Sequence, residues 1–292
     1  MLMRSKNIIL FIVPALIWGS TWYVITFQLG KVDPLVSVVY RYLVAGLAMM
    51  VYCLLRGLNL RFSLRDHAFM VVQGFFLFGA NYWLVYEAEQ YIASALVAVA
   101  FSTIIFMNSG FGALLLNRKI DTKVIVAATA GLLGTILIFW TELQKMELSG
   151  NSLLGTILAI ASVVLASLGN ITSARNSQEK IPVLQANAFG MLYGCGLMTI
   201  VALFLGRPFT FDTSSTYVLS LLYLSIFGSV IAFGTYLTLV SKIGADKAAY
   251  ALVVIPVIAI VFSVFFENYQ LTAMSGLGVV LILGGNVLAL RH

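Results

Sequence analysis

Ten apolar runs of helical length, separated by short polar breaks, divide the chain. The run from Ala248 to Phe266, for example, holds 19 residues without a charge. That length is enough to cross a hydrocarbon core of about 30 Å at about 1.5 Å per residue. Strand-like alternation of apolar and polar residues is absent from these runs. The pattern predicts an all-α integral membrane protein with ten transmembrane helices, at 8–29, 34–55, 67–88, 92–116, 121–140, 152–174, 182–205, 214–240, 246–266 and 272–290.

The two halves of the chain have related patterns. A shift of 151 residues places Ala93 on Gly244 and Ile105 on Pro256. Each copy has an aromatic-rich helix, a turn of small residues, a long apolar helix and a glycine-bearing helix. Because each unit holds five helices, an odd number, the second is expected to run opposite to the first across the membrane, as in secondary transporters. The chain is therefore predicted to form one compact bundle of two inverted five-helix repeats, 1–145 and 146–292.

Composition supports a membrane protein. Of the 292 residues, 61% are hydrophobic and 10% are charged, and the mean hydropathy is +1.01. Soluble domains carry about 25% charged residues. The net charge of +6 is explained by lysines and arginines in the loops. The lipid bilayer is therefore a predicted partner, and nucleic acid is not.

Basic residues are distributed unevenly between the two predicted sides. Only Lys31, Lys145 and Arg207 fall on the outer side if the N-terminus is cytoplasmic, and Arg41 falls within a span. Positively charged loops mark the cytoplasmic face. This predicts a multi-pass protein of the inner (cell) membrane with both termini in the cytoplasm. The first apolar run is long and has no clear small-residue cleavage site, so it is interpreted as a span and not as a signal peptide.

Several segments match a known family. They are IWGSTWY at 17–23, VVYRYLVAG around Arg41, NYWLVYEAEQYIASALVAVAFS at 81–102, SLLYLSIFGSVIAFGTYL at 220–237, GADKAAYALVVIPVIA at 244–259 and FENYQLT at 266–272. On these residues the chain resembles the drug/metabolite transporter superfamily, specifically its EamA-type ten-helix members. Two positions depart from the family pattern. Ile105 stands where the fourth helix usually has a proline, and Arg118 stands where a glutamate often closes that helix.

The resemblance implies a secondary transporter, and specifically an exporter of a small organic metabolite such as an amino acid or a related compound. The expected mechanism is alternating access around a midplane pocket lined by helices 1, 3, 4, 6, 8 and 9. Pro256 interrupts the ninth helix and is the predicted helix bend, because the fourth helix lacks a proline. An importer or exchanger is the alternative within transport. A non-transporting membrane scaffold or receptor subunit is the alternative from another class.

Motifs for other chemistries are missing from the sequence. There is no GxxxxGK[ST] for ATP phosphates. His67 and His292 lie outside the predicted spans, and Cys53 and Cys195 are single residues in apolar runs. No metal site, cofactor or catalytic residue is predicted, and the protein is not expected to be an enzyme. An intramembrane enzyme acting on lipid is the alternative, but no pair of nucleophile and base is visible.

Arg41 is the charged residue predicted to lie deepest in a span, about 10 Å beyond the start of the second helix. A buried arginine requires a polar cavity or an acid. Glu87 is the predicted partner, and Glu267 is a further candidate for a gate or an ion pair. A structural ion pair, or an arginine that reaches the interface, is the alternative. Glu87 is also the candidate for a coupling proton. However, no acid lies at mid-span, which favours substrate exchange or facilitated export over proton antiport.

Aromatic, amide and hydroxyl side chains at mid-depth are the predicted substrate-binding residues. Aromatic rings suit amphiphilic metabolites, and amides supply donors and acceptors without a charge. Packing, or hydrogen bonding between helices, is the alternative role for each of them. Trp22 is assigned to the interfacial aromatic belt instead. The predicted residues are Trp18, Tyr23, Asn81, Tyr82, Tyr86, Ser102, Asn108, Asn170, Asn187, Tyr223, Ser229, Tyr236, Tyr250 and Ser263.

Glycines recur on several predicted helices. Gly190 and Gly194 form a GxxxG pattern, and further glycines lie in the fifth and tenth helices. Faces of small residues let helices approach closely. Packing within the bundle is the expected role, and a homodimer face is the alternative.

Overall fold

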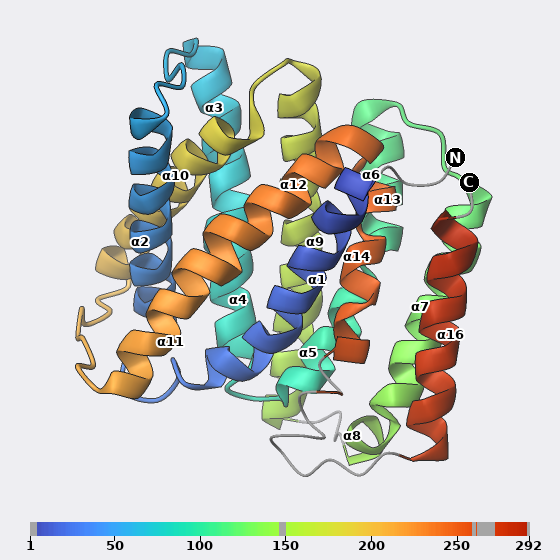
Figure 1. Cartoon of the computed structure of the whole chain (residues 1–292). Coiled ribbons are helices and arrows are strands. Elements are labelled where there is room, and N and C mark those ends of the chain that lie inside the picture. Colours follow the sequence, from blue (N-terminus) through green and yellow to red (C-terminus); the bar gives the residue numbers. More distant parts are fainter. Residues whose placement is uncertain (1–4, 146–149, 259–260, 262–271, 291–292) are drawn as a thin grey trace.

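The computed structural model describes residues 5–145, 150–258, 261 and 272–290, and within these ranges it contains helices and no strand (Figure 1). Two elements, η1 and η2, are π-helical segments. In chain order the elements are α1 (Ser5–Thr26), α2 (Pro34–Leu55), α3 (Leu64–Gln73), η1 (Gly74–Ala80), α4 (Asn81–Ala88), α5 (Ser94–Phe101), α6 (Ile104–Leu116), α7 (Thr122–Ile138), α8 (Trp140–Lys145), α9 (Gly150–Gln178), α10 (Val183–Phe204), α11 (Ser215–Ser225), η2 (Ile226–Ile231), α12 (Ala232–Ile243), α13 (Ala245–Ala248), α14 (Tyr250–Val253) and α16 (Ala273–Leu290).

Seven helical stretches of the described chain are long and apolar enough to cross a membrane. They coincide with the expected first, second, third, fourth, sixth, seventh and eighth spans. The expected fifth and tenth spans are present as shorter apolar helices, Thr122–Ile138 and Ala273–Gly285. Much of the expected ninth span lies outside the described residues. The stretches are Ile8–Thr26, Pro34–Leu55, Leu64–Ala88, Leu96–Leu116, Gly150–Gln178, Val183–Phe204 and Ser215–Ile243.

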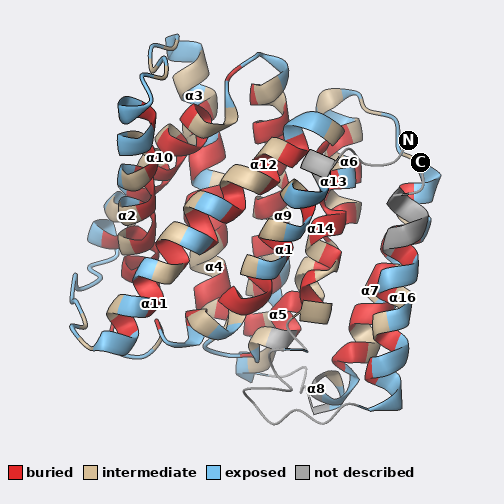
Figure 2. Ribbon diagram, viewed as in Figure 1, coloured by how far each residue is buried: buried red, intermediate tan, exposed pale blue. Residues whose placement is uncertain are grey.

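The outward faces of the bundle are apolar. Leu55 is 82% exposed and Phe204 is 90% exposed, and Figure 2 shows that exposed residues line the outer faces of helices whose inner faces are buried. In water such a surface would be unfavourable, whereas hydrocarbon solvates it. The chain is therefore a multi-pass α-helical membrane protein.

Polar residues in the short breaks start and stop the helices. Asp33 accepts a hydrogen bond from the Leu35 amide at 2.9 Å, and Pro34 occupies the first helical position of α2. Gly244 ends α12 with a φ of 92°, a conformation that favours glycine. These caps let the chain reverse direction within a few residues. Consecutive helices are not always packing partners, because α2 packs against α10 and α11 whereas α1 packs against α12.

The third and eighth spans share an internal feature. Each changes from α-helix to a π-helical segment and back, at η1 in the third span and at η2 in the eighth. The two segments end at Ala80 and Ile231, positions that differ by the same 151 residues as the sequence repeat. A π segment changes the rotation of the helix that follows it, so it resets which residues face the bundle interior.

The fourth and ninth spans are both interrupted, although the ninth was the stronger candidate for a bend. α5 and α6 are separated by a turn at Ser102 and Thr103. The hydroxyls of these residues donate to Val99 O and Ala100 O, each at 2.6 Å, and so compete with the helical ladder. In the ninth span turns fall at Ala249 and at Val254, and the second lies two residues before Pro256. In the fourth span the interruption thus coincides with two side-chain hydroxyl groups. In the ninth span the interruption at Val254 lies close to a proline.

Close helix crossings depend on glycine. A methyl group on Gly194 of α10 would lie 2.6 Å from Gly74 O, and one on Gly134 of α7 would lie 2.7 Å from Gly278 O of α16. Such separations are too short for a Cβ atom, so the backbones touch directly. Gly190 and Gly194 therefore pack within the bundle, which is the role expected for them. Figure 1 shows the α7–α16 pair at one edge of the bundle, across from α2 and α10.

Candidate functional site

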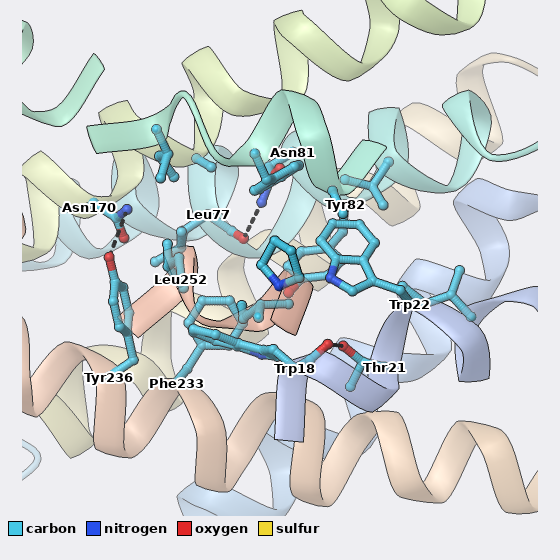
Figure 3. Close-up of a pocket in the computed structure, with 18 residues that line it drawn as sticks. Trp18, Thr21, Trp22, Leu77, Asn81, Tyr82, Asn170, Phe233, Tyr236 and Leu252 are labelled. Atoms are coloured by element: carbon cyan, nitrogen blue, oxygen red, sulfur yellow. Dashed lines mark hydrogen bonds between the residues drawn. The ribbon is translucent and has the colours of Figure 1, made fainter. Parts of the chain in front are cut away.

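A cavity lies where six spans converge, and it has a volume of about 60 Å³. Its residues come from α1, from η1 and α4, from α5 and α6, from α9, from α12, and from α14 with the two lining residues just after it. These are the first, third, fourth, sixth, eighth and ninth spans, the same six that were expected to border a pocket. Figure 3 shows the side chains that point toward this space. The volume admits a few water molecules and is below the roughly 300–1,000 Å³ of most small-molecule sites.

Aromatic rings form much of the wall. The Trp18 ring lies edge-on to Phe233 at 4.8 Å and to Tyr236 at 5.2 Å between centroids. Its Nε1 donates to Gly228 O at 3.0 Å, which joins α1 to η2. Trp22 packs edge-on against Phe101 at 5.3 Å. The wall is apolar and rigid because each ring is held by a neighbour.

Three buried polar atoms among the lining residues have no hydrogen-bond partner. They are Asn81 Oδ1, Asn170 Oδ1 and Trp22 Nε1. The amide nitrogens do have partners, since Asn81 Nδ2 donates to Leu77 O at 3.4 Å and Asn170 Nδ2 donates to Tyr236 Oη at 3.5 Å (Figure 3). A buried polar atom without a partner costs about 1–3 kcal/mol. The lining residues thus include two acceptor atoms and one donor atom that are buried without a partner.

Trp22 was assigned to the interfacial belt from its position in the helix, and that assignment was wrong. Its ring lines the cavity and its indole nitrogen is buried. Trp18 lies one helical turn before Trp22, so the two residues are four positions apart and share one face of α1. That spacing was the available signal in the sequence. Thr21, Phe101 and Phe233 also line the cavity and were missed.

The lining residues include pairs from the two halves. Tyr82 and Phe233, Val85 and Tyr236, Phe101 and Leu252, and Ile104 and Ile255 all line the cavity, and each pair is separated by 151 positions. The Tyr82 and Phe233 rings are 6.0 Å apart. Residues related by the sequence shift therefore meet across a single cavity.

Arg41 lies behind the Tyr82 ring and is fully buried. Its guanidinium carbon is 4.4 Å from the centre of that ring, its Nε donates to Ser229 Oγ at 3.0 Å, and its Nη1 donates to Tyr86 Oη at 3.4 Å. Its Nη2 has no partner. A methyl on Gly228 would lie 3.2 Å from that nitrogen, so glycine leaves room for it. A charge–ring contact and two hydroxyls replace the expected carboxylate.

Glu87 is not the partner of Arg41. Its carboxylate accepts from Trp83 Nε1 at 3.0 Å and from Gln90 Nε2 at 2.7 Å, near the end of the span. The next acid along the chain, Glu89, has both carboxylate oxygens buried without a hydrogen bond. Glu89 lies one residue beyond the span Leu64–Ala88. Burial raises the pKa of its carboxyl well above the usual range, and the nearby Arg41 charge opposes that rise only in part.

The predicted residues fall into five groups. Trp18, Asn81, Tyr82, Asn170, Tyr236 and Pro256 line the cavity. Tyr23 is 37% exposed beside Phe27, whereas Ser102, Asn108, Asn187, Tyr223 and Tyr250 join helices or bond to their own helix elsewhere. Tyr86 and Ser229 hold Arg41. Ser263 and Glu267 lie outside the described residues.

Ion pairs connect the two halves at both ends of the bundle. Lys31 Nζ lies 3.4 Å from Asp212 Oδ2, and Arg207 Nη1 lies 3.2 Å from Asp33 Oδ2. These loops are on the side predicted to be outer. At the other end Arg118 Nη1 lies 3.8 Å from Asp246 Oδ1. The Ser214 amide, which donates to Asp212, lowers the pKa of that carboxyl.

Within the described ranges no cluster of histidine, cysteine and acidic residues is arranged to hold a metal ion.

Apolar spans around an aromatic cavity with unpaired polar atoms define a membrane protein of the transporter type. The sequence model of the EamA-like transporter family matches residues 5–140 and again 153–291. The chain belongs to this family and is a membrane transporter.

Individual relatives agree with this. Protein PagO of Salmonella typhimurium is 25% identical over 99% of this chain and 94% of its own length. The uncharacterized inner membrane transporter YedA of Escherichia coli is 29% identical over 84% of this chain and 78% of its own length. A solved crystal structure superposes with a TM-score of 0.80 at 19% identity, covering 98% of this chain and 96% of that one. This last likeness concerns the fold alone.

Proposed function

We propose that the chain is a secondary transporter that moves a small organic metabolite by alternating access through the cavity. The observation that carries this proposal is the cavity itself, which is lined by pairs of residues related by the 151-residue shift. In this proposal 1–145 and 146–292 form two inverted five-helix repeats, with ten spans in all. Substrate sites between such repeats are typical of secondary transporters.

The interruptions beside the cavity supply the moving parts. Turns at Thr103 and Val254 lie next to the lining residues Ile104 and Ile255. Both turns lack part of the helical hydrogen-bond ladder, so bending there costs little. Because about 60 Å³ is too small for a metabolite, the repeats must separate to admit one. The ion pairs at the two ends would break in turn, one end at a time.

The lining predicts the chemistry of the substrate. Aromatic rings favour a flat or branched apolar body. The unpaired oxygens of Asn81 and Asn170 would accept hydrogen bonds from N–H groups, and the unpaired Trp22 Nε1 would donate a hydrogen bond to an acceptor. A small amphiphile with an amino or amide group, such as an amino acid or related compound, satisfies all three. The proposed direction is export across the inner membrane, with both termini in the cytoplasm.

Counterflow in proteoliposomes tests this proposal. Vesicles loaded with one unlabelled compound from a panel of amino acids, nucleobases and cations are diluted into a trace of the same labelled compound. Saturable accumulation is expected for at least one amphiphile with an N–H group, and Asn81→Leu with Asn170→Leu should abolish it. The exposed loop residue Asn59 provides the matched control, Asn59→Leu. A steady ion current without saturable substrate flux would contradict the proposal and indicate a channel.

A further inference from the structure

Glu89 and Glu87 are two residues apart and differ in the hydrogen bonds that their carboxylates receive. The Glu87 carboxylate is bonded by Trp83 and Gln90. Both oxygens of Glu89 are buried and have no donor, although part of its side chain reaches the surface. An ionised carboxylate without a donor or a counterion is costly to bury. This geometry therefore favours the neutral, protonated form of Glu89, close to the end of the span, where water is within reach.

The surroundings of Glu89 contain one cation. α4 packs chiefly against α9, η1 and α2. Arg41 is the single charged residue of α2, η1 has none, and the single charge on α9 is Arg175 near its other end. The remaining titratable groups facing this region are tyrosines, namely Tyr42 on α2, Tyr82 and Tyr86 on α4, and Tyr217 on α11, which are neutral near pH 7. Arg41 is thus the group to which an ionised Glu89 would respond.

Arg41 connects Glu89 to the cavity. Its Nη2 is unpaired, so it is the atom that an ionised Glu89 would attract. Its other contacts are with Tyr86, with Ser229 of η2, and with the face of the Tyr82 ring, which lines the cavity. A movement of the guanidinium toward Glu89 would weaken these contacts. Protonation of Glu89 therefore biases the position of Tyr82 and of the π segment η2.

We propose, on the basis of the transport function above, that Glu89 is the proton-binding carboxyl of a proton/substrate antiporter. A proton from water on the outer side binds a Glu89 oxygen and neutralises it, which is the form that the unpaired, buried oxygens favour. Release of the same proton on the other side leaves a carboxylate that pairs with Arg41 Nη2. One proton then crosses inward for each substrate that leaves. The sequence favoured uncoupled exchange because no acid lies at mid-span, whereas the structure shows a buried acid at the span's end.

Infrared spectroscopy of the purified protein tests proton binding without a substrate. The difference spectrum between acidic and alkaline buffer reports the C=O stretch of protonated carboxyl groups. In neutral buffer the wild type and the matched control Glu87→Gln are expected to show a protonated carboxyl band that disappears on alkalinisation. Glu89→Gln should lack that band. A band that survives in Glu89→Gln, or that is missing from the wild type, would overturn the assignment.

Flux measurements test the coupling, with the panel compound that gives the strongest counterflow. In vesicles that are acidic inside, the wild type and Glu87→Gln should accumulate that compound several-fold above equilibrium, and a protonophore should abolish the effect. Glu89→Gln should keep counterflow and lose accumulation. Counterflow in the wild type without proton-driven accumulation would refute the coupling alone. The absence of counterflow across the panel would refute the proposed function.

Discussion

The Arg41 guanidinium is held by an aromatic ring and two hydroxyl groups instead of a carboxylate. The ring belongs to Tyr82, and the hydroxyls belong to Tyr86 and Ser229. Charge–ring contacts in a desolvated site contribute about 2 kcal/mol, and hydrogen bonds to a charged group contribute about 1.5–3 kcal/mol. At the residue scale, Arg41 therefore stabilises the protein and also positions a ring of the cavity wall.

Arg41→Ala should damage the protein more than Arg61→Ala. Arg41 is fully buried and Arg61 is exposed between α2 and α3. We expect the buried substitution to lower the unfolding free energy by about 2 kcal/mol or more, and counterflow to be strongly reduced. The loop substitution should stay within about 0.5 kcal/mol. Thermal unfolding in detergent measures both, and equal tolerance of the two changes would remove Arg41 from the account.

The stability of the protein should depend on pH through Glu89. Its folded-state pKa is raised above the ordinary 4.5, so the folded protein binds this proton more tightly than the unfolded chain does. The contribution of Glu89 to the free energy of unfolding is therefore largest at low pH. It is lost as the pH rises from about 4.5 through the raised pKa of the folded state. The slope is at most about 1.4 kcal/mol per pH unit. Thermal unfolding against pH should be flatter for Glu89→Gln than for the wild type and Glu87→Gln. Identical slopes in all three would refute this.

Which of two neighbouring acids is buried could not be read from the sequence. Glu87 and Glu89 both follow the same aromatic run, and their directions depend on the rotation of α4. The π segment η1 precedes α4 and shifts that rotation, so a regular 3.6-residue period gives the wrong face. The burial of Arg41 was predictable from the cost of a charge in a span. Its partners were not, because they come from separate spans.

At the scale of the elements, four spans beside the cavity depart from regular helix. The third and eighth contain π segments, and the fourth and ninth contain turns. The sequence predicted the ninth interruption through Pro256. It did not reveal the fourth, because serine and threonine also occur in uninterrupted membrane helices, such as Thr172 in α9, whose hydroxyl donates to Leu168 O at 2.8 Å.

Removing the hydroxyls of Ser102 and Thr103 should straighten the fourth span. In the double variant Ser102→Ala and Thr103→Ala, Val99 O and Ala100 O lose their side-chain donors and regular helix is favoured there. We expect counterflow to slow several-fold while thermal stability is kept or rises. Thr172→Ala is the matched control and should have little effect on either. Normal counterflow in the double variant would show that this turn is not needed for transport.

At the scale of the whole molecule, the two halves meet at one cavity and are tied together at both ends. The length and apolarity of most spans and the six helices bordering the cavity were predictable, because apolar periodicity and a fixed shift are local properties of the chain. Five of the fourteen predicted substrate-binding residues line the cavity: Trp18, Asn81, Tyr82, Asn170 and Tyr236. The others were placed by depth alone, which does not determine whether a side chain faces inward.

The pair Arg118–Asp246 should hold closed the end of the bundle that is predicted to be inner. Both side chains are partly exposed, so the interaction contributes at most about 1 kcal/mol, or roughly a fivefold change in population. Asp246→Asn should therefore increase the inner-open fraction without unfolding the protein. Labelling of a cysteine introduced at Ala245, which is buried next to this pair, should become faster from the inner side. Unchanged labelling would mean that other contacts close this end.

Alternating access requires the two halves to open the cavity to one side at a time. Distances between spin labels at Lys119 and Lys247, on the end predicted to be inner, and at Lys31 and Thr213, on the end predicted to be outer, measure this opening. All four positions are exposed, and the native cysteines are buried, so labelling is selective. We expect two distance populations for each pair, with substrate and pH shifting the inner and outer pairs in opposite directions. Single, unchanging distances at both ends, or both ends opening together, would contradict it.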